Sequence, residues 1–186
     1  MPKKFTAEER EEFAKEIVSS WESNSDILEE LGPSKKPRKS SKTPVEKLIN
    51  YNWIVGDSVF WQSRQTYLEL LQSFLSKKIN GETLTSEFFR LRSQDMISTD
   101  ELCARIEDRI LPIPDLNYTF KASDFCSAID ELYLEIDRYD PYLEDSDWNE
   151  IVYSESKLRS VIQEEFVPIL QKSCDLDDSF FQSQSE

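Results

Sequence analysis

Apolar side chains repeat at intervals of three and four residues along most of this chain, and this period constrains the fold more than any other feature. In the segment 58–79 they form one broad helical face, made of Val59, Phe60, Tyr67, Leu70, Leu71, Phe74, Leu75 and Ile79. No segment alternates cleanly at period two, and only three glycines are present. The sequence therefore predicts an all-α fold without significant sheet.

Capping residues and helix breakers divide this pattern into separate helices. A capping box at Thr6 and Glu9 begins a helix over 7–22, and Gly32-Pro33 ends that region. Further boundaries are expected at turn and capping residues along the rest of the chain. They are breaks at Gly56-Asp57, Asn80-Gly81 and Asp140-Pro141, helix starts at Thr85 or Ser86, at Ser98–Glu101, at Ser123 or Asp124 and at Ser154, and a kink or final turns at Pro168.

Composition divides the chain into four parts. They are an N-terminal helical segment (1–32), a basic linker (33–44), a helical bundle (45–174) and an acidic frayed tail (175–186) in which Phe180 and Phe181 dock weakly. The amphipathic helices of the bundle predict an antiparallel four-helix-bundle-like core, with the N-terminal helix as an appendage. The linker holds five bases and three prolines, so we interpret it as a solvated tether; a nuclear-import or nucleic-acid patch is the alternative.

Acidic residues are concentrated after residue 56. The net charge is −15, and residues 1–56 contribute none of it, because they hold ten bases and ten acids. Between 122 and 155, eleven acids stand against one base, Arg138. Such a surface repels nucleic acid and anionic lipid and attracts basic proteins. We therefore expect a basic protein partner and no direct nucleic-acid or membrane binding; a merely solvated surface is the alternative.

The residue types on which most enzymes rely are missing. The chain has no His, which removes the commonest general base and metal ligand, and three glycines cannot build a phosphate-binding loop. A cluster of carboxylates falls opposite the apolar stripe of its helix, which argues against a di-metal site inside the bundle: Asp130, Glu131, Glu135 and Asp137. We expect no catalytic site, no metal and no cofactor.

The cysteines and the hydropathy pattern bear on the compartment. Cys103, Cys126 and Cys174 are too widely spaced for a disulfide framework or a zinc site, which predicts thiols in a reducing compartment. No apolar run approaches the ~20 residues of a transmembrane helix, and the acidic N-terminus does not fit a signal peptide. We expect a cytoplasmic protein, and the sequence does not indicate its oligomeric state.

Two groups of aromatic residues are candidates for recognition. The first joins two expected helices, and we interpret it as core packing rather than as a recognition platform: Tyr51, Trp53, Phe60 and Trp61. The second is interleaved with the densest acids, and we interpret it as a set of interface anchors, with packing at the end of the bundle as the alternative: Tyr139, Tyr142, Trp148 and Tyr153.

Three stretches within residues 67–172 carry a resemblance to a known family. They are YLELLQSFLSKKINGETLTSEFFRL, FCSAIDELYLEIDRYDP and SESKLRSVIQEEFVPIL. From Ile129 to Tyr139, the second matches a signature of the form Ile/Leu-Asp-x-Leu-Phe/Tyr-x-x-Ile/Val-Asp-x-Tyr. The chain thus resembles the bacterial self-protective, colicin-like immunity family, typified by the colicin D immunity protein. It departs from that family by its N-terminal extension and by the inserted segment 97–116.

The resemblance implies a four-helix bundle that binds a secreted tRNA-cleaving toxin domain and blocks its active site, with carboxylates in place of substrate phosphates. It implies Asp130, Glu131, Asp137 and Asp140 as contact acids. With the charge and aromatic patterns, the predicted partner-binding residues are Asp130, Glu131, Asp137, Tyr139, Asp140, Tyr142, Glu144, Asp145, Asp147 and Trp148. The second hypothesis is a structural or adaptor subunit that docks on a basic protein of a larger assembly, which the basic linker favours.

Overall fold

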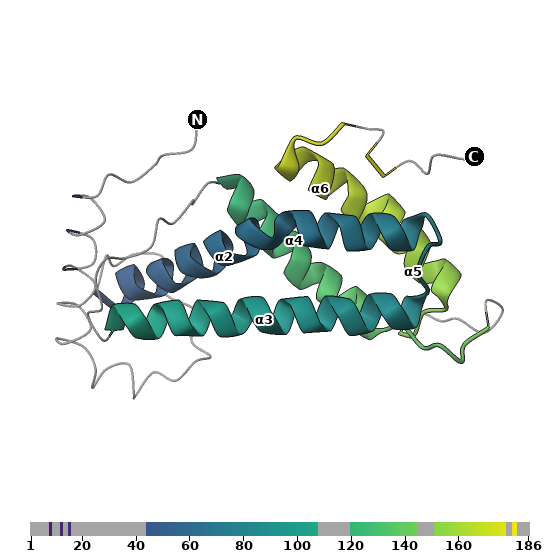
Figure 1. The fold of residues 1–186 in the computed structure, drawn as a ribbon, viewed down its shortest axis with the longest axis horizontal. Helices are drawn as coiled ribbons and strands as arrows, with labels where there is room; N and C mark the ends of the chain where they lie inside the picture. The colour runs from purple at the N-terminus through teal and green to yellow at the C-terminus, as the bar shows by residue number, and fades with distance from the viewer. Residues whose placement is uncertain are drawn as a thin grey trace.

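The computed structural model describes residues 8, 12, 15, 44–107, 120–144, 151–177, 180 and 181. Within these ranges the chain is all-α, as the sequence predicts, with one isolated bridge between Tyr139 and Tyr153. The antiparallel helices α2 (Pro44–Leu75) and α3 (Gly81–Glu107) lie side by side, and α4 (Phe120–Asp137) packs across α2 (Figure 1). A final helix, made of α5 (Glu155–Val161), η1 (Ile162–Phe166) and α6 (Val167–Cys174), completes the bundle against α4.

The expected N-terminal segment and linker fall almost entirely outside the described residues. Glu8, Glu12 and Lys15 are helical and exposed, which agrees with the helix expected over 7–22. The expected linker ends at Pro44, and this residue already begins α2.

The expected helix break at Gly56-Asp57 is wrong, because α2 runs through both residues. The Asp57 side chain does not cap a helix; it accepts hydrogen bonds from Ser123 and Cys126 of α4. Ser58 is buried, and its Oγ donates to the carbonyl of Ile54, 2.7 Å away. Packing against α3 and α4 along the helix outweighs the cost of one glycine, which is about 1 kcal/mol in a helix interior.

Helix α3 also runs longer than the capping pattern predicts. It begins at Gly81 rather than at Thr85 or Ser86, because Asn80 Oδ1 accepts the backbone N–H of Thr83 at 2.9 Å and so caps the first turn. The separate helix expected at Ser98–Glu101 is wrong. There, Ser98 and Thr99 donate to the carbonyls of Gln94 and Asp95, four residues back, and the helix continues.

The remaining boundaries are closer to expectation. Helix α4 begins at Phe120, before the expected cap at Ser123 or Asp124. Ser154 caps α5 as predicted, because its Oγ accepts the N–H of Lys157 at 3.3 Å. The expected irregularity at Pro168 is present, since the chain takes a turn of π-helix, η1, immediately before the short α6 that contains this proline.

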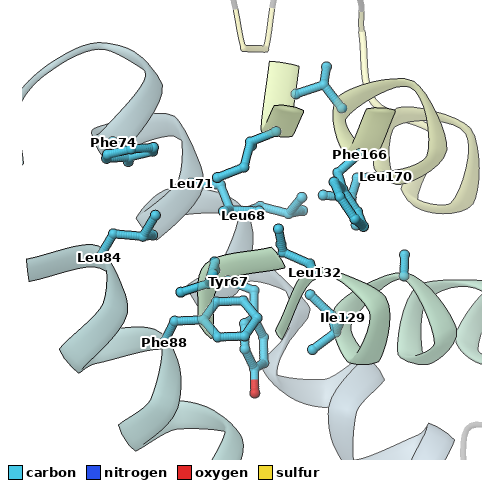
Figure 2. Packing of buried hydrophobic residues seen from close by; sticks show 14 of the residues in the cluster. Tyr67, Leu68, Leu71, Phe74, Leu84, Phe88, Ile129, Leu132, Phe166 and Leu170 are labelled. Atoms are coloured by element: carbon cyan, nitrogen blue, oxygen red, sulfur yellow. The ribbon is translucent and has the colours of Figure 1, made fainter. Parts of the chain in front are cut away.

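One hydrophobic core joins all the packed helices, with Tyr67 near its centre (Figure 2). The Tyr67 ring meets Phe88 of α3 and Phe125 of α4 edge to face, with ring centroids 5.5 and 6.2 Å apart. The largest fully buried side chains are Tyr67, Phe74, Phe88, Phe125, Leu68, Leu71, Leu84, Ile129, Leu132, Ile136 and Leu158. Near the C-terminus, Phe181 is buried, so the expected docking of this side chain is confirmed.

A buried carboxylate links α2 to α3. Asp95 is only 6% exposed, and it accepts hydrogen bonds from Ser63 Oγ at 2.8 Å and from the Tyr67 hydroxyl at 2.9 Å. Burial raises the pKa of Asp95 above its ordinary value, against the lowering effect of these two hydrogen bonds. The network holds the two long helices in register at the expense of a desolvated charge.

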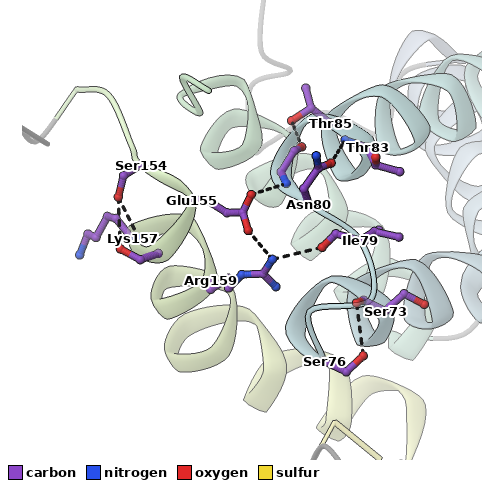
Figure 3. Close-up of polar contacts among 12 residues, drawn as sticks. Ser73, Ser76, Ile79, Asn80, Thr83, Thr85, Ser154, Glu155, Lys157 and Arg159 are labelled. Carbon is purple, nitrogen blue, oxygen red and sulfur yellow. Dashed lines mark hydrogen bonds and ion pairs between the residues drawn. The ribbon is translucent and has the colours of Figure 1, made fainter. Parts of the chain in front are cut away.

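A second polar network joins the start of the final helix to the turn between α2 and α3 (Figure 3). Glu155 accepts the N–H of Gly81 at 2.8 Å, which places a carboxylate at the N-terminus of α3. Arg159 Nη2 donates to the carbonyl of Ile79 at 3.1 Å and to Glu155 at 2.5 Å, and its guanidinium lies over the Phe74 ring. These contacts fix the end of the bundle nearest the acidic residues that follow α4.

Candidate functional site

The outer face of α4 carries exposed carboxylates. Asp130, Glu131 and Asp137 are all exposed. They face away from the buried stripe of the same helix because residues at three- and four-residue spacing share a face. That stripe consists of Phe125, Ile129, Leu132 and Ile136, all with no exposed surface. These three predicted contact acids are therefore accessible to a partner.

Apolar side chains stand among these acids. Leu134 is 60% exposed, and it lies three or four residues from Asp130, Glu131 and Asp137, so it shares their face. Just beyond the helix, Tyr142 is 90% exposed, and Glu144 is exposed as well. We call the set Asp130, Glu131, Leu134, Asp137, Tyr142 and Glu144 the acidic surface. Acids around accessible apolar groups suit protein contact better than a purely charged face does.

Nearby arginines neutralise part of the predicted acid cluster. Arg92 of α3 donates to Asp130 at 2.9 Å and lies over the Tyr133 ring, a pairing that the sequence pattern did not indicate. Arg138 pairs with Glu135 at 2.9 Å, so Glu135 does not belong to the accessible acids. Its expected position opposite the core is wrong: Glu135 is partly buried and binds Tyr153.

Two of the predicted interface aromatics serve the fold instead. Tyr153 is 7% exposed, and its hydroxyl donates to Glu135 at 2.7 Å and accepts from Arg138 at 2.7 Å. The Tyr139 ring packs so closely on the start of α3 that a Cβ at Gly81 would lie 2.4 Å from it. Burial raises the pKa of both tyrosines. For this pair, packing at the end of the bundle is the correct interpretation.

The other predicted contact residues after α4 differ in how accessible they are. Tyr142 remains an exposed aromatic, whereas Asp145, Asp147 and Trp148 lie outside the described residues. Asp140 is half-buried, and its Oδ1 accepts the N–H of Tyr142 at 2.9 Å, which shapes the turn that presents the tyrosine. Asp140 thus positions a contact residue in addition to carrying charge.

A groove between α2 and α4 was not anticipated from the sequence. It measures about 500 Å³ and is lined by Trp53, Ile54, Asp57, Ser123, Cys126, Ser127 and Asp130. Burial raises the pKa of Asp57 and of the Cys126 thiol. The groove adjoins the acidic surface, because Asp130 belongs to both.

The aromatic group assigned to core packing is divided by the structure. Phe60 is buried, and Trp61 packs edge to face on Phe125 with ring centroids 5.9 Å apart, as expected. For Trp53 the core interpretation is wrong, because this side chain is 59% exposed at the groove. The Tyr51 side chain lies outside the described residues. Helical spacing alone did not distinguish Trp53 from its buried neighbours.

Within the described ranges, no group of three His, Cys, Asp or Glu side chains could hold a metal ion. No helix in this part of the chain is long and apolar enough to cross a membrane.

Comparisons with known proteins give no family for this chain. No family model matches it, and no similar curated protein or solved structure was found. Its function has to be argued from the acidic surface and the groove.

Proposed function

We propose that this chain is a non-catalytic binding protein whose acidic surface docks on a basic protein. The observation that carries this proposal is the outer face of α4, where exposed Asp130, Glu131 and Asp137 surround an exposed Leu134. The resemblance of residues 67–172 to colicin-like immunity proteins suggests the kind of partner. It is a tRNA-cleaving toxin nuclease domain, whose basic active site the carboxylates would cover.

Electrostatics and apolar contact contribute different parts of such binding. Exposed carboxylates speed the approach of a basic partner and set its orientation, but solvent and salt weaken each pair. Leu134 and Tyr142 supply apolar area, which salt does not screen. The proposal therefore predicts an association rate that falls steeply with added salt and a dissociation rate that depends on the apolar residues.

The test uses the full chain immobilised in three forms. Wild type, Asp137→Lys and Glu101→Lys are exposed to lysate of the native source, and bound proteins are identified by mass spectrometry. Glu101→Lys is the matched control, because it makes the same charge change at an exposed position in the last two turns of α3. That end of α3 lies at the opposite end of the bundle from the end of α4 (Figure 1). A basic nuclease retained by wild type and Glu101→Lys, but lost from Asp137→Lys, is the expected result.

Inhibition gives the second measurement. In the absence of the wild-type chain, the captured nuclease should cleave tRNA. It should lose this activity when an equimolar amount of the wild-type chain is added. Asp137→Lys should inhibit at least tenfold more weakly at low salt, where surface charges act over longer distances. Equal inhibition by wild type and Asp137→Lys would show that the acidic surface is not the binding face.

A structural or adaptor role is the second candidate, and one observation favours it. Met96 and Ile97 on α3 are 46% and 58% exposed, which gives the bundle a further apolar area outside the acidic surface. An adaptor would use more than one face. Recovery of a large stable complex that survives Asp137→Lys and is lost from Ile97→Asp would support this candidate over the inhibitor.

A further inference from the structure

The groove between α2 and α4 has the composition of a cation-binding site. The two helices lie against each other (Figure 1), and the groove opens beside Trp53 and Asp57 of α2 and Cys126 and Asp130 of α4. Two of its described lining residues are carboxylates, and none of the lining residues that the structure describes is Lys or Arg. Ser123 and Ser127 add hydroxyl groups. A positively charged group entering this groove would meet two acids, one of which, Asp130, already pairs with Arg92.

The two carboxylates, Asp57 and Asp130, differ in the partners that they already have within the fold. Asp57 receives hydrogen bonds from Ser123 and Cys126, but within the described part of the chain no arginine or lysine pairs with it. At Asp130, both hydrogen bonds from Arg92 go to the same carboxylate oxygen, Oδ1, at 3.3 and 2.9 Å. A partly buried carboxylate without a cation gains more from a new positive charge than an exposed one does.

Trp53 supplies a third element. Its side chain is 59% exposed at the groove, in contrast to Phe60 and Trp61, which lie about two turns further along α2. An indole face attracts a guanidinium more strongly than other aromatic rings do, and a planar guanidinium can stack on it while donating to carboxylates at its edge. Such an arrangement serves arginine better than lysine, whose ammonium cannot stack.

We propose that the groove between Trp53, Asp57 and Asp130 receives an arginine side chain of the basic partner. This inference rests on the proposed function and deepens it, because it names the group that the partner inserts next to the acidic surface. The acidic surface steers the partner, and the groove anchors it through one desolvated arginine. A single buried anchor of this kind contributes more to affinity than several exposed charge pairs do.

The experiment follows the Trp53 indole N–H of the full chain by NMR, with the resonance assigned from Trp53→Phe. The probe is a capped hexapeptide of alternating Arg and Gly. A second peptide carries citrulline, which has the shape of arginine without its charge, and a third carries lysine. We expect the Arg peptide to shift the Trp53 resonance, the Lys peptide to bind more weakly, and the citrulline peptide to leave the resonance in place.

Variants then locate the binding. Titration calorimetry measures the variants, because Trp53→Ala lacks the indole that the NMR experiment follows. Trp53→Ala and Asp57→Asn should each weaken binding of the Arg peptide by roughly fivefold to tenfold, since each removes one element of the site. Asp124→Asn is the matched control: it makes the same charge change at an exposed position of α4 that does not line the groove, and it should leave affinity unchanged. Binding should also lower the pKa of Asp57, because a guanidinium stabilises the charged carboxylate.

The outcomes separate this inference from the proposed function. If Asp57→Asn and Asp124→Asn lowered affinity for the Arg peptide equally, the arginine site would be overturned. Binding of the citrulline peptide as tightly as the Arg peptide would overturn it as well. A natural partner lost from Asp137→Lys but bound normally by Trp53→Ala would also overturn it, while the acidic surface would stand. A further outcome concerns the five bases of 33–44. If replacing them by serine strengthens binding of the Arg peptide, the chain's own linker occupies the groove, and the partner's arginine is refuted as its occupant.

Discussion

Glu135 and Asp137 are two residues apart on α4, yet they lie in regions of opposite character. Glu135 faces the end of the bundle, where it binds Arg138 and the hydroxyl of the nearly buried Tyr153. Asp137 faces outward beside the exposed Leu134. Both regions contain an acid and an apolar or aromatic neighbour, so composition does not distinguish them. The difference indicates that accessibility, rather than charge density, distinguishes the proposed contact surface from the part of α4 that stabilises the fold.

The largest expected contrast is between two leucines on opposite faces of α4. Leu132→Ala should lower the free energy of unfolding by about 3 kcal/mol, because Leu132 is fully buried and its removal leaves a cavity. Leu134→Ala should change it by less than about 0.5 kcal/mol, because that side chain is 60% exposed. Urea denaturation measures both, and a large loss from Leu134→Ala would break the distinction between the two faces.

Two tyrosines near the end of α4 provide the next contrast. Tyr153→Phe removes a hydroxyl that bonds to Glu135 and Arg138 and should destabilise the fold by about 1–2 kcal/mol. Tyr142→Phe should leave stability unchanged, because Tyr142 is 90% exposed. Thermal melts of both variants test this, and partner binding should respond only to loss of the Tyr142 ring, as in Tyr142→Ala.

A buried and an exposed aspartate should respond differently to pH. Asp95 has a raised pKa because of burial, so its contribution to stability becomes less favourable as pH rises from its ordinary pKa of 3.8 through the raised value. Asp95→Asn keeps polar groups for Ser63 and Tyr67 without the charge, and should stabilise the chain by about 1 kcal/mol at pH 7.

The advantage of Asp95→Asn should shrink toward acid pH, where Asp95 in the native chain is itself protonated. Asp137→Asn is the control, since that carboxylate is exposed. Urea midpoints from pH 3 to pH 8 follow the difference. A constant gap between Asp95→Asn and wild type across this range would show that desolvation of the charge is not its cause.

A small effect on stability is also expected at Asp130. Its bond to Arg92 is an ion pair with a half-exposed carboxylate, so Asp130→Asn should cost no more than about 0.5 kcal/mol. The same change should weaken binding of the basic partner, because Asp130 belongs to both the acidic surface and the groove. A variant that lost stability but kept affinity would move Asp130 into the structural region with Glu135.

The sequence predicted which residues are apolar and helical better than it predicted where helices begin and end. The stripe of Phe125, Ile129, Leu132 and Ile136 is buried as its period indicates. The breaks at Gly56 and at Ser98–Glu101 were wrong, because local capping preferences amount to about 1 kcal/mol each and packing along α2 and α3 exceeds them. Short-range signals fail where long helices gain continuous contact.

The candidate site was predicted in part. The accessible acids of α4 follow from its helical period, since they lie opposite the buried stripe. The groove was missed, because Trp53, Asp57 and Cys126 come from two helices separated in sequence, and no local pattern brings them together. For Tyr139 and Tyr153 the preferred interface interpretation was wrong and the alternative, packing at the end of the bundle, was correct, because their roles depend on contacts with Gly81 and Glu135.

By itself, the sequence determined the helical class, the face of α4 that carries charge, and the absence of histidine chemistry, because period and composition are local properties. Only the tertiary structure decided which charges and rings remain accessible. Arg92 reaches Asp130 across 38 residues of sequence, Tyr153 turns inward, and Trp53 stays outside. Accessibility depends on what packs against each side chain, and that is settled only when distant helices meet.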